Sequence, residues 1–65
     1  MDCKKLAEAK AFWGNQDNDD LLFALYDYAR SVERAMHDKD FDLYESSNLN
    51  CTAVMRILGD RLKGA

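Results

Sequence analysis

Proline is absent from the 65-residue sequence, and glycine occurs only at positions 14, 59 and 64. These two residue types are the strongest interruptions of helices, so a chain that lacks them in its interior favours long helices. Only Gly14 separates two segments, because the other glycines lie near the end of the chain. No repeat, low-complexity tract or linker divides the sequence. We therefore predict one all-α domain over residues 1–65.

Cysteine is also scarce, with one residue at position 3 and one at position 51. Two cysteines are too few for the disulfide framework of a small secreted protein. A single bridge is conceivable, but Cys51 falls within an apolar helical pattern, where a thiol behaves as a small hydrophobic group. Nothing at the N-terminus resembles a signal peptide, so the glycosylation sequon at Asn50 is expected to be accidental. We expect a reduced, cytoplasmic protein.

Long apolar runs are missing, since none approaches the roughly 18 residues that cross a membrane. The formal net charge of -3 is unevenly distributed: residues 17–45 carry -6, residues 1–16 carry +1 and residues 46–65 carry +2. Phosphate neutralisation by basic residues supplies most of the affinity of a generic nucleic-acid binder, so an acidic middle disfavours that function. The residues expected to form the acidic surface are Asp19, Asp20, Asp27, Asp38, Asp40 and Asp42.

Residues suited to catalysis are few, and His37 is the only histidine. No serine, cysteine or second histidine is spaced to complete a nucleophile site with it. Residues 15–19 and 38–42 begin like calcium-binding loops, but both lack the glycine at the sixth and the glutamate at the twelfth position. Helix capping explains these acids better. We predict no enzymatic activity, no metal and no cofactor.

Apolar residues recur at helical spacing over most of the chain. Gly14 is predicted to end the first helix in a left-handed conformation. Asp17 or Asn18 is expected to cap the second helix, and Asp38 or Asp40 the third. The pattern predicts three helices, one short and two long, at about residues 2–13, 18–37 and 40–63.

The two long helices are separated by a short joint and are predicted to form an antiparallel hairpin. A two-helix hairpin with one short helix beside it cannot cover both apolar sides of the last helix, so we expect it to dimerise into a larger bundle. Weak helix formers near Ser47 leave open a break in the last helix. In the last helix the apolar residues recur at steps of three and four, as in a coiled-coil seam. The predicted core of the hairpin consists of Leu25, Val32 and Met36 against Tyr44, Cys51, Met55 and Leu58.

Two apolar surfaces fall outside that seam and are candidate partner-binding sites. Phe23, Tyr26 and Arg30 combine residue types that are enriched in binding hot spots. The alternative is that the N-terminal helix folds over the two aromatic side chains, because small domains rarely leave large apolar patches exposed. The second candidate surface is the flank Leu43, Val54 and Ile57, which could equally pack against the first helix.

Asn48 lies on the seam of the last helix, where a buried asparagine can fix register and oligomeric state in a coiled coil. No motif assigns the chain to a family. In layout it resembles small helical hairpins that dimerise into four-helix bundles, including plasmid copy-number regulators that bind paired RNA loops. Such a resemblance implies a fold and not a function. An RNA-binding face would also need clustered basic residues, and the nine here are spread over the chain.

The leading hypothesis is a non-enzymatic protein-interaction module that acts as a homodimer or docks on a larger protein, in a regulatory or accessory role. Its size is typical of accessory proteins of phages and mobile elements. One alternative is an acidic mimic that occupies a nucleic-acid-binding protein, in which case binding should weaken steeply with salt. A further alternative is direct RNA or DNA binding through the basic ends.

Overall fold

The computed structural model describes residues 2–64, which form three helices and no strand. Helix α1 spans Cys3–Trp13, α2 spans Asn18–Asp38 and α3 spans Phe41–Gly64. Each boundary lies within one residue of its predicted position, and α3 continues without a break past Ser47. The all-α architecture follows from the helical periodicity and the absence of interior helix breakers.

Each helix begins at an aspartate whose carboxylate accepts hydrogen bonds from backbone N–H groups of the first turn. Asp2 caps α1, Asp17 accepts from the N–H of Asp20, and Asp40 accepts from the N–H of Leu43. These contacts satisfy donors that have no partner inside the helix. The acids of the joints therefore serve helix capping.

The left-handed residue predicted at Gly14 lies elsewhere. Gly14 has φ -62° and continues the right-handed path, so that prediction was wrong. Its lack of a side chain still matters, because a Cβ there would lie 2.9 Å from the carbonyl oxygen of Lys10. The left-handed residue is Lys39, with φ 56°, which ends α2 in the reversal that leads into α3. There the N–H of Asp40 bonds the carbonyl of Ala35, which is the Schellman pattern of a helix end.

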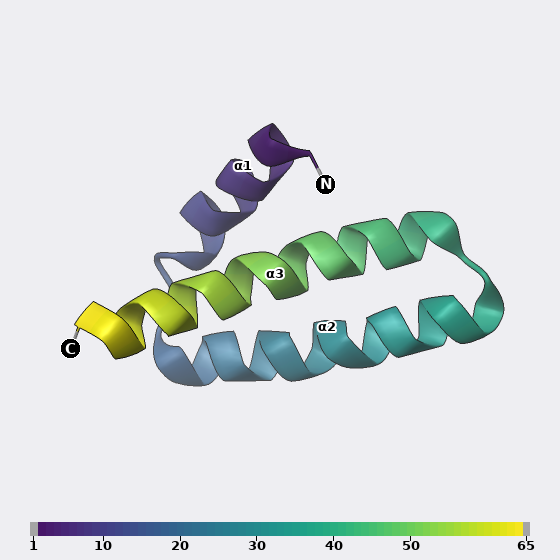
Figure 1. Ribbon diagram of the computed structural model, residues 1–65. Helices are drawn as coiled ribbons and strands as arrows, with labels where there is room; N and C mark the ends of the chain where they lie inside the picture. The colour runs from purple at the N-terminus through teal and green to yellow at the C-terminus, as the bar shows by residue number, and fades with distance from the viewer. Residues whose placement is uncertain (1, 65) are drawn as a thin grey trace.

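Helices α2 and α3 lie side by side and run in opposite directions, and α1 packs mainly against α3 (Figure 1). α1 stands at an angle to the hairpin and joins it through the turn before α2. The molecule is elongated, with principal extents of 39, 24 and 17 Å. The hairpin is therefore covered by α1 on one side only.

The core is formed by small and medium-sized side chains near the open end of the hairpin. Leu21 and Ala24 of α2 pack with Val54 and Ile57 of α3, and Trp13 of α1 packs against this cluster. Among the described residues, Leu21 and Val54 are the largest side chains that are fully buried. Further along the helices the buried positions are small: Ala35, Ser47 and Ala53.

The predicted seam is only partly the core of the hairpin: Leu25 and Leu58 pack against the core cluster and are half-buried. Met36 and Met55, both assigned to the core from their spacing, are exposed by 67% and 57%. Helix α3 is rotated so that Val54 and Ile57 of its flank are buried in the core. The exposed side chains of the stripe with coiled-coil spacing are Phe41, Tyr44, Met55 and Leu62. A physical reason is that alanine and serine at the interface let the two helices approach closely, which the bulkier methionine and tyrosine side chains would prevent.

Arg61 ties the turn between α1 and α2 to the end of α3. Its guanidinium donates to the backbone carbonyls of Gly14 and Gln16 at 3.2 and 2.8 Å, and to the side-chain oxygen of Asn18 at 2.7 Å. A planar guanidinium presents several donors in a fixed geometry, which suits such a set of acceptors. One side chain therefore fixes the point where all three helices meet.

Trp13 anchors α1 at the same end of the molecule. Its indole N–H donates to the side-chain oxygen of Asn50 at 3.1 Å, and its ring meets that of Tyr28 edge-on at 6.0 Å. A tryptophan that is partly buried in this way gains both packing and a satisfied donor. Within α1, the buried residue is Leu6.

Candidate functional site

The largest unexplained feature is a row of exposed apolar side chains on α2 and α3. Nine large apolar or aromatic side chains are exposed in the described part of the chain, and six of them lie on one face of the hairpin. Leu62 is the most exposed, at 82%. We call this surface the open face and define it by Leu22, Met36, Phe41, Tyr44, Met55 and Leu62.

Helix geometry places these residues on the same side. Successive residues rotate by about 100°, so Leu22 lies about 100° from buried Leu21, and Met55 about 100° from buried Val54 in the same sense. In two antiparallel helices, equal rotations away from the shared interface lead to the same side of the pair. The six residues of the open face are all rotated in this sense, by about 60–140°, and therefore lie on one side of the pair.

Helix α1 covers the other side of the hairpin. Trp13 of α1 donates a hydrogen bond to Asn50 of α3. Around the axis of α3, Asn50 and Met55 lie on opposite sides of Val54. Asp20 and Asp27 line a hollow between α1 and α2. Around the axis of α2, these two residues and Leu22 lie on opposite sides of Leu21. The open face thus has no neighbouring element in the described chain.

The sequence pattern of the open face is that of a coiled-coil seam. In α3, positions 41, 44, 48, 51, 55, 58 and 62 alternate steps of three and four over the whole helix. In α2, positions 22, 25, 29, 32 and 36 do the same. Asn48 occupies one of these positions and is partly buried. Both stripes are suited to packing against another helix.

The open face is hollowed where the hairpin turns. A notch of about 210 Å³ lies between the end of α2 and the start of α3, with almost entirely apolar exposed walls. Met36, Phe41 and Tyr44 of the open face line it, together with Ala35 of the core. At the opposite end of α3, Leu62 projects as the most exposed side chain.

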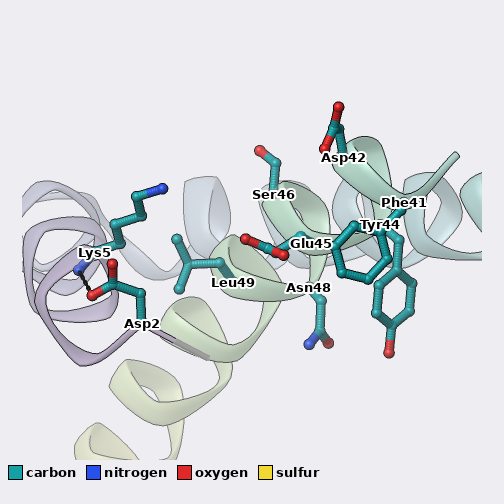
Figure 2. A pocket seen from close by; sticks show the side chains of 9 residues that line it. All are labelled: Asp2, Lys5, Phe41, Asp42, Tyr44, Glu45, Ser46, Asn48 and Leu49. Carbon is teal, nitrogen blue, oxygen red and sulfur yellow. Dashed lines mark hydrogen bonds between the residues drawn. The ribbon is translucent and has the colours of Figure 1, made fainter.

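A larger groove of about 560 Å³ continues around the outside of α3. Figure 2 shows Phe41, Tyr44 and Asn48 at one end of it, and Asp2 and Lys5 of α1 at the other. The carboxylate of Asp2 is engaged by the backbone N–H groups at the start of α1. The groove is therefore an extension of the open face and not a separate chemical site.

The first predicted partner surface is brought together as expected from its helical spacing. Phe23 and Tyr26 are exposed by 71% and 64%, and the guanidinium of Arg30 lies 5.7 Å from the centre of the Tyr26 ring. The alternative that the N-terminal helix covers these aromatics is not what the structure has, because α1 packs on α3. The three residues form a stripe on the outer edge of α2, beside the open face.

The second predicted surface requires a correction. Val54 is fully buried and Ile57 is 8% exposed, and both belong to the core with Leu21 and Ala24. Leu43 is partly buried. Burial against α2 and Trp13 removes Val54 and Ile57 from any surface that a partner could reach. Sequence reasoning predicted none of the six open-face residues as partner-binding, and it assigned Met36, Tyr44 and Met55 to the core from their seam spacing.

The predicted acidic residues are all exposed, but they lie in separate groups. Asp38, Asp40 and Asp42 lie around the turn of the hairpin, whereas Asp19 and Asp20 lie at the start of α2. These groups are separated by most of a 21-residue helix, about 30 Å long. Asp38 also pairs with Arg34 at 3.7 Å. Asp27 lies between the two groups, on the same side of α2 as Asp20 and Asp38.

The remaining candidates for chemistry within residues 2–64 are the metal-ligating and nucleophilic side chains. No three His, Cys, Asp or Glu side chains gather there as a metal site would require. Cys3 and Cys51 are free thiols, and His37 is exposed and contacts its neighbour Asp38. No helix in this range is both long and apolar enough to cross a membrane.

Comparison with protein-family models, with curated proteins and with solved structures finds no match for this chain.

Proposed function

We propose that this chain is a non-enzymatic protein-interaction module that binds through its open face, in a regulatory or accessory role. The observation that carries the proposal is the row of six large apolar side chains on the side of the hairpin that α1 leaves uncovered. Small soluble domains rarely leave large contiguous apolar patches exposed unless they mark an interaction site. The partner is a second copy of this chain, a larger protein, or both in turn.

The composition of the open face supports a protein partner. Aromatic and methionine side chains are enriched in the centres of protein interfaces, and charged side chains are depleted there. Phe41, Tyr44 and two methionines are among the six residues that define the open face, while Glu33, Lys39 and Asp40 lie at its edges. Coiled-coil spacing on both helices favours a helical surface as the partner.

The competing idea of an acidic mimic makes a different prediction. Attraction between charges is screened by salt, with a Debye length of about 8 Å at physiological ionic strength. A complex formed through the acidic groups would therefore dissociate steeply as salt rises, whereas one formed through apolar burial would persist. We favour the second outcome, because six large apolar side chains are exposed on the open face.

The proposal is tested by affinity capture from extracts of the native host at 0.1 and 0.5 M salt, using wild type, Met55→Asp and Phe23→Ala. A carboxylate on the open face should abolish capture because it cannot be buried without a partner. We expect Met55→Asp to lose the partner at both salt concentrations, and Phe23→Ala to retain it. Loss with Phe23→Ala alone would instead place the function on the outer aromatic stripe. Ile57→Asp is unsuitable as a variant, since it would disrupt the core.

A further inference from the structure

We propose that the occupant of the open face is a second copy of this chain, packed with its hairpin turn at the opposite end, so that two hairpins form an antiparallel four-helix bundle. This inference rests on the proposed function, because it names the partner of the same face. In this arrangement α3 packs along α3 of the second copy, and α2 along its α2. The two copies are related by a two-fold axis perpendicular to the helices.

The size of the open face is appropriate for such a dimer. A helix of 24 residues is about 36 Å long, and two helices about 10 Å apart present a surface about 20 Å wide. The resulting area of about 700 Å² is close to the roughly 800 Å² that each partner buries in a standard stable interface. A second hairpin covers this face along its full length.

The shape of the face favours the arrangement with turns at opposite ends. Leu62 projects at the free end of α3, and the notch lined by Met36, Phe41 and Tyr44 lies at the turn end. With opposite ends together, Leu62 of each copy meets the notch of the other. With turns at the same end, the two-fold axis would run along the helices and place α3 opposite α2 of the second copy, so Leu62 would not reach a notch.

The charges along α3 are complementary in the same arrangement. The first half of α3 carries Asp42 and Glu45 and has a net charge of -2, whereas residues 53–64 have a net charge of +2. When α3 packs antiparallel to its own copy, the acidic half of each helix lies beside the basic half of the other. Such complementarity of charge steers association.

The core of a single copy leaves stability to be gained from dimerisation. Seven buried apolar residues form the core of the described chain, and three of them are alanines. Domains of about 65 residues bury only about 60% of their unfolded surface and are often stabilised by oligomerisation. Covering the six exposed side chains of the open face would nearly double the number of buried apolar groups. The same contact would enclose Asn48, which can then fix the register of the pair.

Dimerisation is measured by sedimentation equilibrium over a concentration series from about 0.1 to 500 µM. We expect wild type to dimerise with a dissociation constant in the micromolar range, which lies within the range for interfaces of this size. Met55→Asp should weaken the dimer by at least about 100-fold, because the two-fold axis places two carboxylates in the interface. The matched control is Ser46→Asp, which adds the same charge on an exposed position toward α1 and should leave the dimer unchanged.

Circular dichroism on both variants separates dissociation from unfolding, and Met55→Asp should retain its helix content. A wild type that remains monomeric up to 500 µM would overturn the second copy as occupant. If Met55→Asp still abolished the capture of host proteins in that case, the proposed function would remain supported. If Met55→Asp weakens neither the dimer nor the capture of host proteins, both this inference and the proposed function are wrong.

The orientation is measured with a spin label on Lys39→Cys in a background with Cys3→Ser and Cys51→Ser. Turns at opposite ends place the two labels about 36 Å apart along the bundle, which is the length of α3. Turns at the same end would place them within about 20 Å, which is the width of the bundle. The longer distance supports the proposed arrangement, and the shorter one would overturn it.

Discussion

Val54→Asp is expected to unfold the chain at 25 °C, whereas Met55→Asp, one residue further along, leaves the monomer helical. The side chain of Val54 is fully buried in the core cluster, and that of Met55 is 57% exposed. A carboxylate buried without a partner costs several kcal/mol, which is comparable to the total stability of about 3–10 kcal/mol for a domain of this size. Circular dichroism at low micromolar concentration, with urea titration, measures the difference.

The pair of variants also discriminates between two orientations of α3. If the coiled-coil stripe formed the core of the hairpin, Met55→Asp would be the destabilising change and Val54→Asp would be tolerated. Both variants add one negative charge at adjacent positions of the same helix, so each serves as the control for the other. Equal stability of the two would contradict the described packing.

Arg61→Ala is expected to lower the unfolding free energy by about 1–2 kcal/mol. The substitution removes three hydrogen bonds from the charged guanidinium, two of them to backbone carbonyls of the turn between α1 and α2. Hydrogen bonds to charged groups contribute about 1.5–3 kcal/mol each when well buried, and partial exposure reduces their net effect. The melting temperature should fall by about 5–15 °C.

The control for this variant is Arg56→Ala, which removes the same charge from an exposed position of α3. Surface substitutions of this kind change stability by less than about 0.5 kcal/mol. Melts of the two variants by circular dichroism, at one protein concentration and one salt concentration, measure the difference. A similar melting temperature for both would show that the contacts of Arg61 add nothing beyond its charge.

The helices and their caps could be predicted from the sequence because their causes are local. Hydrophobic periodicity, the absence of proline and the aspartates before each helix act within a few residues of one another. The left-handed residue was predicted at the wrong position because glycine is preferred, but not required, after the end of a helix. Lys39 adopts the left-handed conformation in the reversal between α2 and α3, which both helices determine.

The orientation of α3 could not be predicted from its periodicity, because the helix carries two adjacent apolar stripes. Both stripes satisfy a helical repeat, and which one faces α2 depends on how closely the backbones approach. The small residues Ala24, Ala35, Ser47 and Ala53 were the available signal, since small side chains permit close packing. The contacts of Arg61 were also beyond sequence reasoning, because they join residues 43 to 47 positions apart.

The central claim is that a single copy leaves Met36 and Met55 exposed on an open apolar face. Oxidation by hydrogen peroxide, followed residue by residue with mass spectrometry, reports directly on methionine exposure. At nanomolar protein concentration, where the dimer is dissociated, we predict that both methionines react within a few-fold of their rates in the urea-unfolded chain. Their reaction should slow as the concentration rises and the second copy covers the face. Rates at nanomolar concentration that are many-fold slower than in urea would contradict the account, because they would place these side chains in the core of the single chain.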